Sequence, residues 1–271
     1  MTTSTFPFDT PNEPFTLAED QRWSRYGEPG ILTGPEPAPQ WLITDDGAIE
    51  TELGTLKSGK EADVDLLERT AGARTHLLAA KRYRSREHRD FHRDSVYTDG
   101  RRERRSRDQR AVTRGTRYGR AVQAGQWAGT EFSVLCDLAA AGAPVPYPVQ
   151  LDGTEILMEL VTDVTGDPAP RLAATRPDPE LLAHYWDELR RAMRILASRQ
   201  LAHGDLSPYN VLATGERLVV IDVPQVVDLV ANPHGIEMLS RDCRTMCSWF
   251  TARGLGQDPD VLLAEMISFA W

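Results

Sequence analysis

Lysine is nearly absent from this sequence. It occurs three times, as Lys57, Lys60 and Lys81, whereas arginine supplies the other 28 of the 31 basic residues. Each lysine becomes a candidate functional group, because its compact ammonium serves roles that the planar arginine fork does not.

Cysteine is scarce as well. The three residues, Cys136, Cys243 and Cys247, are too few and wrongly spaced for a disulfide framework or a zinc site. Cys243 and Cys247 fall on the apolar face of a predicted helix, which favours a place in the core. We therefore assign the cysteines no function.

Long apolar runs are missing too. No stretch of about 18 apolar residues occurs, and the first residues lack the basic and apolar regions of a signal peptide. We therefore expect no membrane partner and a cytoplasmic location. With 41% hydrophobic and 26% charged residues the composition is that of a folded globular protein, which excludes collagen-like, coiled-coil and wholly disordered classes.

The charge is unevenly placed. The net charge is −9, yet residues 82–120 hold fourteen arginines against six acidic residues and so carry +8. Such a stretch cannot form a core, and one interpretation is a solvated insertion. The alternative is a segment that docks on RNA or a ribosomal particle, which the acidic remainder of the chain would repel.

The hydrophobic pattern indicates an α+β chain with two lobes. Residues 1–46 are rich in proline, and we expect them to be a largely unstructured N-terminal segment. Residues 47–158 are expected to form an N-lobe that contains the arginine-rich insertion, and residues 159–271 a hinge and a mostly helical C-lobe. The periodicity predicts strands within 49–67, 77–83, 155–161 and 218–223, and helices over 127–141, 179–200, 235–253 and 259–269.

One segment carries the chemistry. The sequence HGDLSPYN at 203–210 precedes an apolar strand that ends at Asp222. Phosphoryl transfer needs an aligned nucleophile and a metal ion that neutralises phosphate charge. Asp205 can orient an acceptor hydroxyl and take its proton, while Asn210 and Asp222 offer the oxygen ligands that Mg²⁺ prefers. We expect His203 to brace this loop by hydrogen bonding rather than to act as a base.

A second motif would hold the nucleotide. Ser58, Gly59 and Lys60 form a short loop between two strands, whose amides could cover phosphates, although one glycine in such a place is usually only a hairpin. Lys81 ends the next strand and can reach the α- and β-phosphates of ATP while it pairs with a helix carboxylate, for which Glu131 is the candidate.

These residues resemble those of the RIO atypical serine/threonine protein kinases, and in particular their type-1 branch. The resemblance spans roughly residues 50–255 and rests on an ordered series of motifs. They are SGKEA at 58–62, AAKRY at 79–83, FHRDSVYTDGRRERR at 91–105, WAGTEF at 127–132, ILMELV at 156–161, GDPAPRL at 166–172, HGDLSPYN at 203–210, IDVPQ at 221–225 and SRDCRTMCSWF at 240–250.

The resemblance implies a two-lobed protein-kinase-like fold, with a small antiparallel sheet and one helix in the N-lobe and a reduced C-lobe. It places adenine against Met158 and against the backbone of Glu159 and Val161. It also implies Mg²⁺ or Mn²⁺ on Asn210 and Asp222, and an Asp222 that can be transiently phosphorylated during an ATPase cycle.

Two departures from the family pattern are visible. Pro208 stands where the family usually has an acidic residue, and Pro224 stands where it has serine. Neither removes a catalytic group, although Pro208 lies where the choice of acceptor would be affected.

The sequence leaves three functions open. The first is a serine/threonine protein kinase that uses Mg-ATP on an unknown protein acceptor. The second is a kinase-like ATPase switch that docks on a ribonucleoprotein, and it would use the same residues. The third is a small-molecule phosphotransferase of the aminoglycoside-kinase type, which the short C-lobe disfavours because such enzymes usually carry a large helical insertion there.

Overall fold

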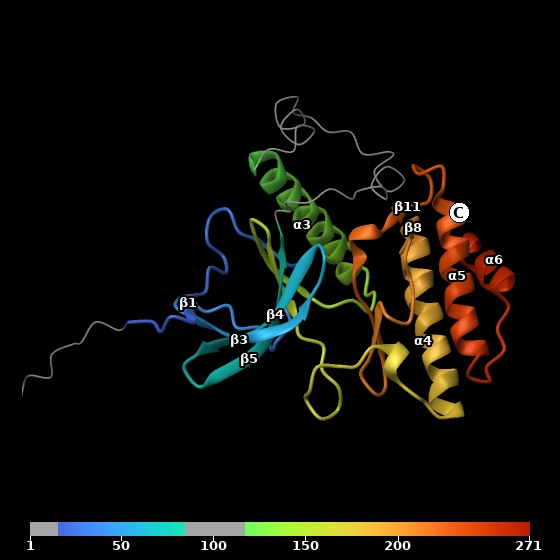
Figure 1. Cartoon of the computed structure of the whole chain (residues 1–271), viewed down its shortest axis with the longest axis horizontal. Helices are drawn as coiled ribbons and strands as arrows, with labels where there is room; N and C mark the ends of the chain where they lie inside the picture. The colour runs from blue at the N-terminus through green and yellow to red at the C-terminus, as the bar shows by residue number, and fades with distance from the viewer. Residues whose placement is uncertain (1–15, 85–116) are drawn as a thin grey trace, which may run out of the picture.

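A computed structural model describes residues 16–84 and 117–271, and side chains within 117–122 and at residue 225 are not described. The described chain forms two lobes, one built on a sheet and the other mainly on helices (Figure 1). The expected two-lobed α+β fold is confirmed.

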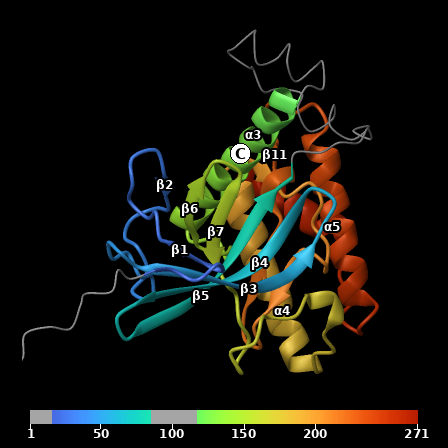
Figure 2. The same cartoon turned by 60° about the vertical axis from the view of Figure 1, so that its left-hand side comes forward.

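The N-lobe is a seven-stranded sheet in which every pair of neighbours is antiparallel, in the order β1-β3-β4-β5-β7-β6-β2. Figure 2 shows its long central strands beside one another. One face buries an apolar cluster around Leu67 and Leu78, and the other carries the helix α3 (Arg117–Ala140). The strands are β1 (Gln21–Trp23), β2 (Leu32–Thr33), β3 (Ile49–Ser58), β4 (Ala62–Ala71), β5 (Arg74–Tyr83), β6 (Pro148–Asp152) and β7 (Glu155–Glu159).

Residues 16–46 differ from the expectation of an unstructured segment over 1–46. β1 pairs with β3 and β2 pairs with β6, so this segment covers both edges of the sheet. Proline prevents a long strand here, but contacts hold the segment in place: Arg22 forms ion pairs with Glu50 and Glu155. Trp41 packs edge-on against Tyr147. Residues 1–15 lie outside the described residues.

A buried ion pair lies beneath this segment. Arg69 on β4 is fully buried and donates to Glu50 at 2.6 Å and to the side-chain oxygen of Gln150 at 2.7 Å. It also donates to the carbonyl of Ile43 at 3.2 Å. A buried guanidinium is tolerated only where most of its donors are satisfied, so this network ties the N-terminal segment to the sheet.

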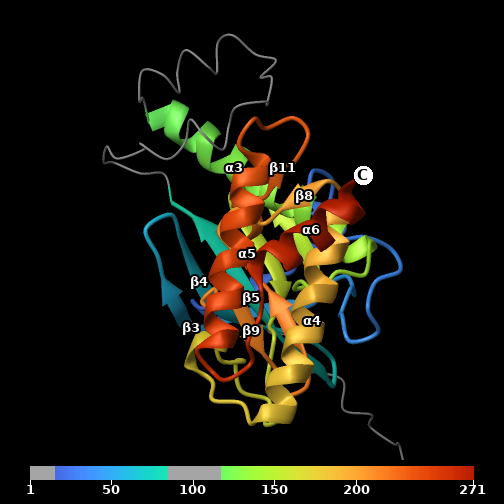
Figure 3. The same cartoon turned by 90° about the vertical axis from the view of Figure 1, so that its right-hand side faces the viewer.

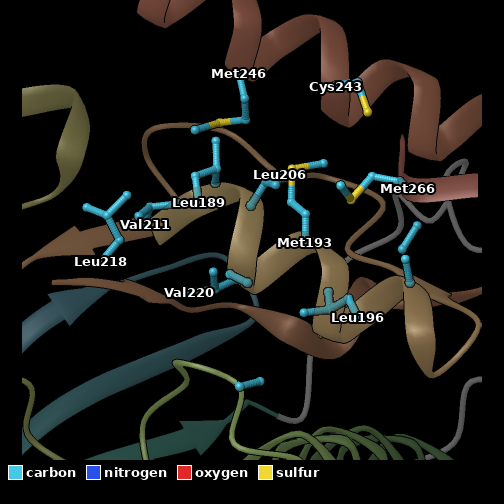
Figure 4. Close-up of a cluster of buried hydrophobic side chains, with 14 of the residues drawn as sticks. Leu189, Met193, Leu196, Leu206, Val211, Leu218, Val220, Cys243, Met246 and Met266 are labelled. Atoms are coloured by element: carbon cyan, nitrogen blue, oxygen red, sulfur yellow. The ribbon is translucent and has the colours of Figure 1, made fainter. Parts of the chain in front are cut away.

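The C-lobe packs three helices around one apolar core. Figure 3 shows α4 (Pro179–Ser198), α5 (Gly235–Thr251) and α6 (Pro259–Ala270) together. Leucine, valine and methionine side chains fill the space between these helices and the small strands (Figure 4). Cys243 and Cys247 are buried in this core, as expected. The strands are β8 (Leu201–Ala202), β9 (Val211–Ala213), β10 (Leu218–Val220) and β11 (Val227–Asp228), and the 3-10 turns are η1 (Leu172–Ala174) and η2 (Val223–Gln225).

The arginine-rich insertion is shorter than expected. Arg82 and Tyr83 belong to β5, and α3 already begins at Arg117, ten residues before the helix that we predicted. The prediction for the remainder, residues 85–116, lies outside the described residues. Within the parts of the chain that the structure describes, no helix has the length and apolar character needed to cross a membrane.

The environment of His76 on β5 makes a pH-dependent contribution to stability. Both ring nitrogens are buried and have no hydrogen-bond partner among the described residues. Burial, with the cations Arg69 and Arg74 nearby, lowers the pKa of His76 from 6.5 to about 4. The unfolded state therefore binds more protons between these two pH values, and the folded state loses stability as the pH falls through this window.

We predict that His76→Phe removes this pH dependence while it keeps the edge-on contact with Trp41. Between pH 4 and 6.5 the free energy of unfolding of the wild type should rise by on the order of 1 kcal/mol more than that of the variant, a figure reduced because the ring is partly screened by solvent. Denaturant titrations at several pH values measure this difference. Parallel curves for the two proteins would contradict the assignment.

Candidate active site

The centre of the site is Lys81. Its ammonium lies 2.6 Å from Glu131 on α3 and 3.2 Å from Asp222, which follows β10. Burial alone would lower the pKa of Lys81, but the two carboxylates raise it, so the lysine stays charged. The sequence prediction that Lys81 pairs with Glu131 is confirmed by this contact.

Packing and a hydrogen bond fix Glu131. Two apolar residues of α3 near Glu131, Ala128 and Phe132, pack with Ile156 of β7. This packing holds α3 against the sheet. The Glu131 carboxylate is buried and accepts from the Tyr83 hydroxyl on its other oxygen. Both oxygens are therefore satisfied, and burial beside this carboxylate raises the pKa of Tyr83. Glu131 can thus orient Lys81 but is not placed to move protons itself.

Asp222 is kept ionised. Burial favours its protonated form, but Lys81, then Lys57 and His203, hold its pKa below the ordinary value. Its backbone adopts a left-handed conformation, with φ 66° and ψ 53°. The short helix η2 begins directly after Asp222, and Pro224 is its second residue. This position tolerates proline because a backbone N–H there would have no partner within the helix.

The loop at 203–210 is held by its own polar groups. His203 donates from Nε2 to the carbonyl of Ile221 at 3.0 Å and accepts the N–H of Asp205 on Nδ1 at 3.3 Å. These contacts confirm the prediction that His203 braces the loop. Asn210 donates its amide to the carbonyl of Asp205 at 2.9 Å, which leaves its side-chain oxygen for another partner.

Asp242 on α5 holds the same loop from beneath, and sequence reasoning missed its role. Its two oxygens accept the N–H groups of Gly204 at 2.8 Å and Leu206 at 2.9 Å. The side chain is 1% exposed, and burial raises its pKa. A signal was present: Asp242 falls on the buried face of α5 between Met238 and Met246, where an acid is rarely found without a partner.

Arg241, the neighbour of Asp242, also reaches the loop. It donates to the carbonyl of Gly204, and its guanidinium lies 3.9 Å from the carboxylate of Asp205. The side chain of Asp205 is 54% exposed. An external hydroxyl can therefore approach its carboxylate.

The glycine hairpin has a tight geometry. The N–H of Gly59 donates to the carbonyl of Ala62 at 3.0 Å, and an added Cβ would approach that carbonyl to 2.9 Å, so a side chain does not fit. Ser58 accepts from Arg84 at 2.8 Å, and Lys60 is exposed in the turn. The Gly59 amide thus has a partner within the hairpin, and the use of this loop to cover phosphates stays a prediction.

The connection between the lobes follows β7. Met158 packs against apolar clusters of both lobes. The N–H of Glu159 donates to the carbonyl of Tyr147 at 2.9 Å, and the side-chain carboxylate of Glu159 accepts the N–H of Tyr147 at 3.0 Å. Val161 accepts from Ala169 at 2.9 Å, whereas its own N–H has no hydrogen-bond partner among the described residues. Val161 is buried, so this amide is suited to a ligand acceptor.

The donor atoms fit a magnesium ion shared with a phosphate. The oxygen of Asn210 and the ionised carboxylate of Asp222 belong to adjoining segments, because the N–H of Ile221 donates to the carbonyl of Asn210 at 2.9 Å. Within the described residues no group of three or more His, Cys, Asp or Glu side chains could enclose a metal. A site with two protein ligands matches the way Mg²⁺ binds with substrate phosphates and water.

Comparison with known proteins identifies the relatives of this chain. The RIO domain profile matches residues 72–261. The chain is 35% identical over 222 residues to the RIO-type serine/threonine-protein kinase Rio1 of Haloferax volcanii, which covers 82% of this chain and 71% of the relative. This chain belongs to the RIO kinase family.

Other RIO kinases match over less of their length. Human serine/threonine-protein kinase RIO3 is 32% identical over 130 residues, which is 48% of this chain and 25% of that protein. The Rio2 kinase of Chaetomium thermophilum, solved as an ADP/Mg²⁺-phosphoaspartate complex, has a TM-score of 0.55 and 21% identity, over 80% of this chain and 62% of that one. Family membership places the chain among the atypical serine/threonine protein kinases and decides against the aminoglycoside-kinase alternative.

We predict that Asp242→Asn destabilises this RIO kinase, because it turns an amide NH₂ toward one of the two backbone donors of the loop. Leaving a buried donor unsatisfied should lower the free energy of unfolding by about 1–3 kcal/mol. The matched control is Asp258→Asn, since Asp258 also accepts two backbone N–H groups but at the exposed start of α6, where asparagine caps equally well. Equal effects of the two changes in denaturant titrations would refute the assigned role.

Proposed function

We propose that this protein is an ATP-dependent phosphotransferase that transfers phosphate from Mg-ATP to a serine or threonine of a protein acceptor. The observation that carries this proposal is the contact of Lys81 with both Glu131 and Asp222, which brings charged groups of the two lobes together. An ammonium held in this way presents a fixed positive charge to phosphates, as phosphoryl transfer requires.

The adenine end is assigned to the connection between the lobes. Met158 would line the adenine pocket, the buried N–H of Val161 would donate to the base, and the backbone of Glu159 would supply a further contact. The partnered N–H of Glu159 limits that contact to its carbonyl. The hairpin residues Ser58, Gly59 and Lys60 would lie over the phosphates, with Lys60 as the charged group.

The reaction end is assigned to the loop and its neighbour. Asn210 and Asp222 would hold Mg²⁺ or Mn²⁺, and a metal bound there neutralises charge on the phosphate oxygens. Asp205 would orient the acceptor hydroxyl and take its proton, because it is exposed, while its backbone is fixed by His203 and Asn210. The guanidinium of Arg241 lies 3.9 Å from the carboxylate of Asp205, whose side chain remains 54% exposed.

A second function uses the same residues. In an ATPase cycle Asp222 would accept the γ-phosphoryl group on a carboxylate oxygen, with release of ADP, and water would then hydrolyse the acyl phosphate to return free phosphate. The proximity of Asp222 to Lys81 and the description of the Rio2 complex with phosphoaspartate favour this possibility. Phosphate label that hydroxylamine removes from Asp222 would distinguish this cycle from label on serine or threonine of an acceptor.

We predict different losses for Asp205→Ala and Asp222→Ala. Mg-ATP at 100 to 1,000 times its Kd should stabilise the wild type by roughly 3–4 kcal/mol, seen as a rise in Tm. Asp205→Ala should keep this rise and lose phosphoryl transfer, since its carboxylate serves the acceptor, whereas Asp222→Ala should lose both. No rise for the folded wild type would overturn nucleotide binding, and identical behaviour of the two variants would overturn the division of roles.

We further propose that the arginine-rich segment binds RNA, for instance within a ribosomal particle. The segment carries +8 and the remaining chain −17, so an anionic partner would approach only there. Arg82 and Arg84 are engaged in ion pairs with strand carboxylates, which leaves the arginines of residues 85–116, outside the described residues, for phosphate contacts. Arginine suits this role because it grips phosphate and stacks on exposed bases.

For this proposal we predict a salt-dependent affinity for single-stranded RNA. Five phosphate contacts would give a slope of about −3.5 for log K against log salt, at ~0.7 for each contact. Replacing Arg101, Arg102, Arg104 and Arg105 by alanine should flatten the slope by roughly 3 and leave the ATP affinity unchanged. An unchanged slope in the fourfold variant, or binding that does not depend on salt, would reject RNA binding by this segment.

A further inference from the structure

A second lysine, Lys57, lies on the sheet near Lys81. In the sheet, Lys57 of β3 pairs with Val64 of β4, and Val64 pairs with Lys81 of β5. Residues directly opposite one another in antiparallel strands point to the same face. Lys57 therefore lies on the same face of the sheet as Lys81, about 10 Å away across two strand spacings.

An arginine approaches from the other lobe. Arg171 precedes η1 and forms an isolated bridge with Leu212 of β9, and the next residue of β9, Ala213, donates its N–H to the carbonyl of Pro170. β9 directly follows Asn210. Arg171 is therefore fixed to the strand that leaves the metal-binding end of the loop.

Lys57 and Arg171 are near enough for the charge of one to act on the other. Burial and the charge of Arg171 lower the pKa of Lys57, Asp222 raises it, and Lys81 lowers it further. Lys81 has two carboxylate partners, whereas neither Lys57 nor Arg171 has an ion-pair partner within the described parts of the chain. Two positive charges without an ion-pair partner among the described residues thus come from opposite lobes, and an anion between them would relieve their repulsion.

We propose that Lys57 and Arg171 form a clamp on the terminal phosphate of the nucleotide, one from each lobe. This inference rests on the proposed binding of Mg-ATP. Lys81 lies nearest the inner phosphates in such a site. The strand β7 leads to the proposed adenine end of the site. Lys57 lies two strands farther from β7 than Lys81 does, in the same cross-strand row. Lys57 is therefore placed to contact the phosphate that lies farthest from adenine. Arg171 would contact the same phosphate from the C-lobe, on the side where Asn210 lies.

The experiment measures Kd values of the full chain for a non-hydrolysable ATP analogue, ADP and adenosine, each with Mg²⁺, by calorimetry. Lys57→Gln and Arg171→Gln should each weaken the ATP analogue about tenfold, as expected for one charge-assisted hydrogen bond. The Kd for ADP should change by less than about twofold in either variant. Adenosine affinity should not change, and this result also reports an intact fold. The matched control is Arg176→Gln, an exposed cation in the same connection.

The double variant tests whether both groups grip one phosphate. If they do, the factor by which the double variant raises the Kd for the ATP analogue should be smaller than the product of the factors for the two single variants, since the groups share a partner. Equal weakening of the ATP analogue and ADP, or wild-type affinity in both single variants, would overturn the clamp. A wild type that binds adenosine but no nucleotide, or nothing at all, would overturn the proposed function instead.

Discussion

The structure depends on one buried ammonium. Lys81 can lie in the interior only because two carboxylates, from different parts of the fold, compensate the loss of its hydration. Glu131 comes from α3 and Asp222 from the C-lobe, so the same charge connects the sheet, the helix and the second lobe. Separating α3 from the sheet would leave the buried Glu131 without this cation, and leaving a buried charge unpaired costs several kcal/mol.

The polar groups of the loop at 203–210 show a related constraint. Asp242 and His203 satisfy backbone groups of the loop from the C-lobe side, and the Asn210 amide NH₂ bonds the carbonyl of Asp205. The backbone is thus fixed without using the carboxylate of Asp205 or the side-chain oxygen of Asn210. These oxygens stay available to a substrate and a metal. An active site on a loop needs this arrangement, because positioning within a fraction of an ångström requires a rigid support behind the reacting groups.

The sequence was most informative where residue type and spacing both reflect the chemistry. The pairing of Lys81 with Glu131, the bracing role of His203 and the main helices could be predicted, since a lone lysine and an amphipathic period have few alternative explanations. The support by Asp242 could not, because an acid in a helix gives no sign of which backbone it bonds. The high proline content of residues 16–46 led to the prediction of an unstructured segment. That prediction was wrong because the segment pairs with distant strands, and such contacts cannot be seen in the sequence.

The choice between lysine and arginine also follows from the geometry. Arginine makes the ion pairs on the flanks of the sheet, as Arg82 does with three carboxylates at once, because its fork carries several donors in one plane. The space between Glu131 and Asp222 has a carboxylate on either side and room for a compact charge. An ammonium with three rotatable donors meets both carboxylates and can still turn a third donor toward a phosphate, whereas a guanidinium spreads its donors over a larger planar group. At position 81, lysine therefore suits a place where one small cation must have several partners.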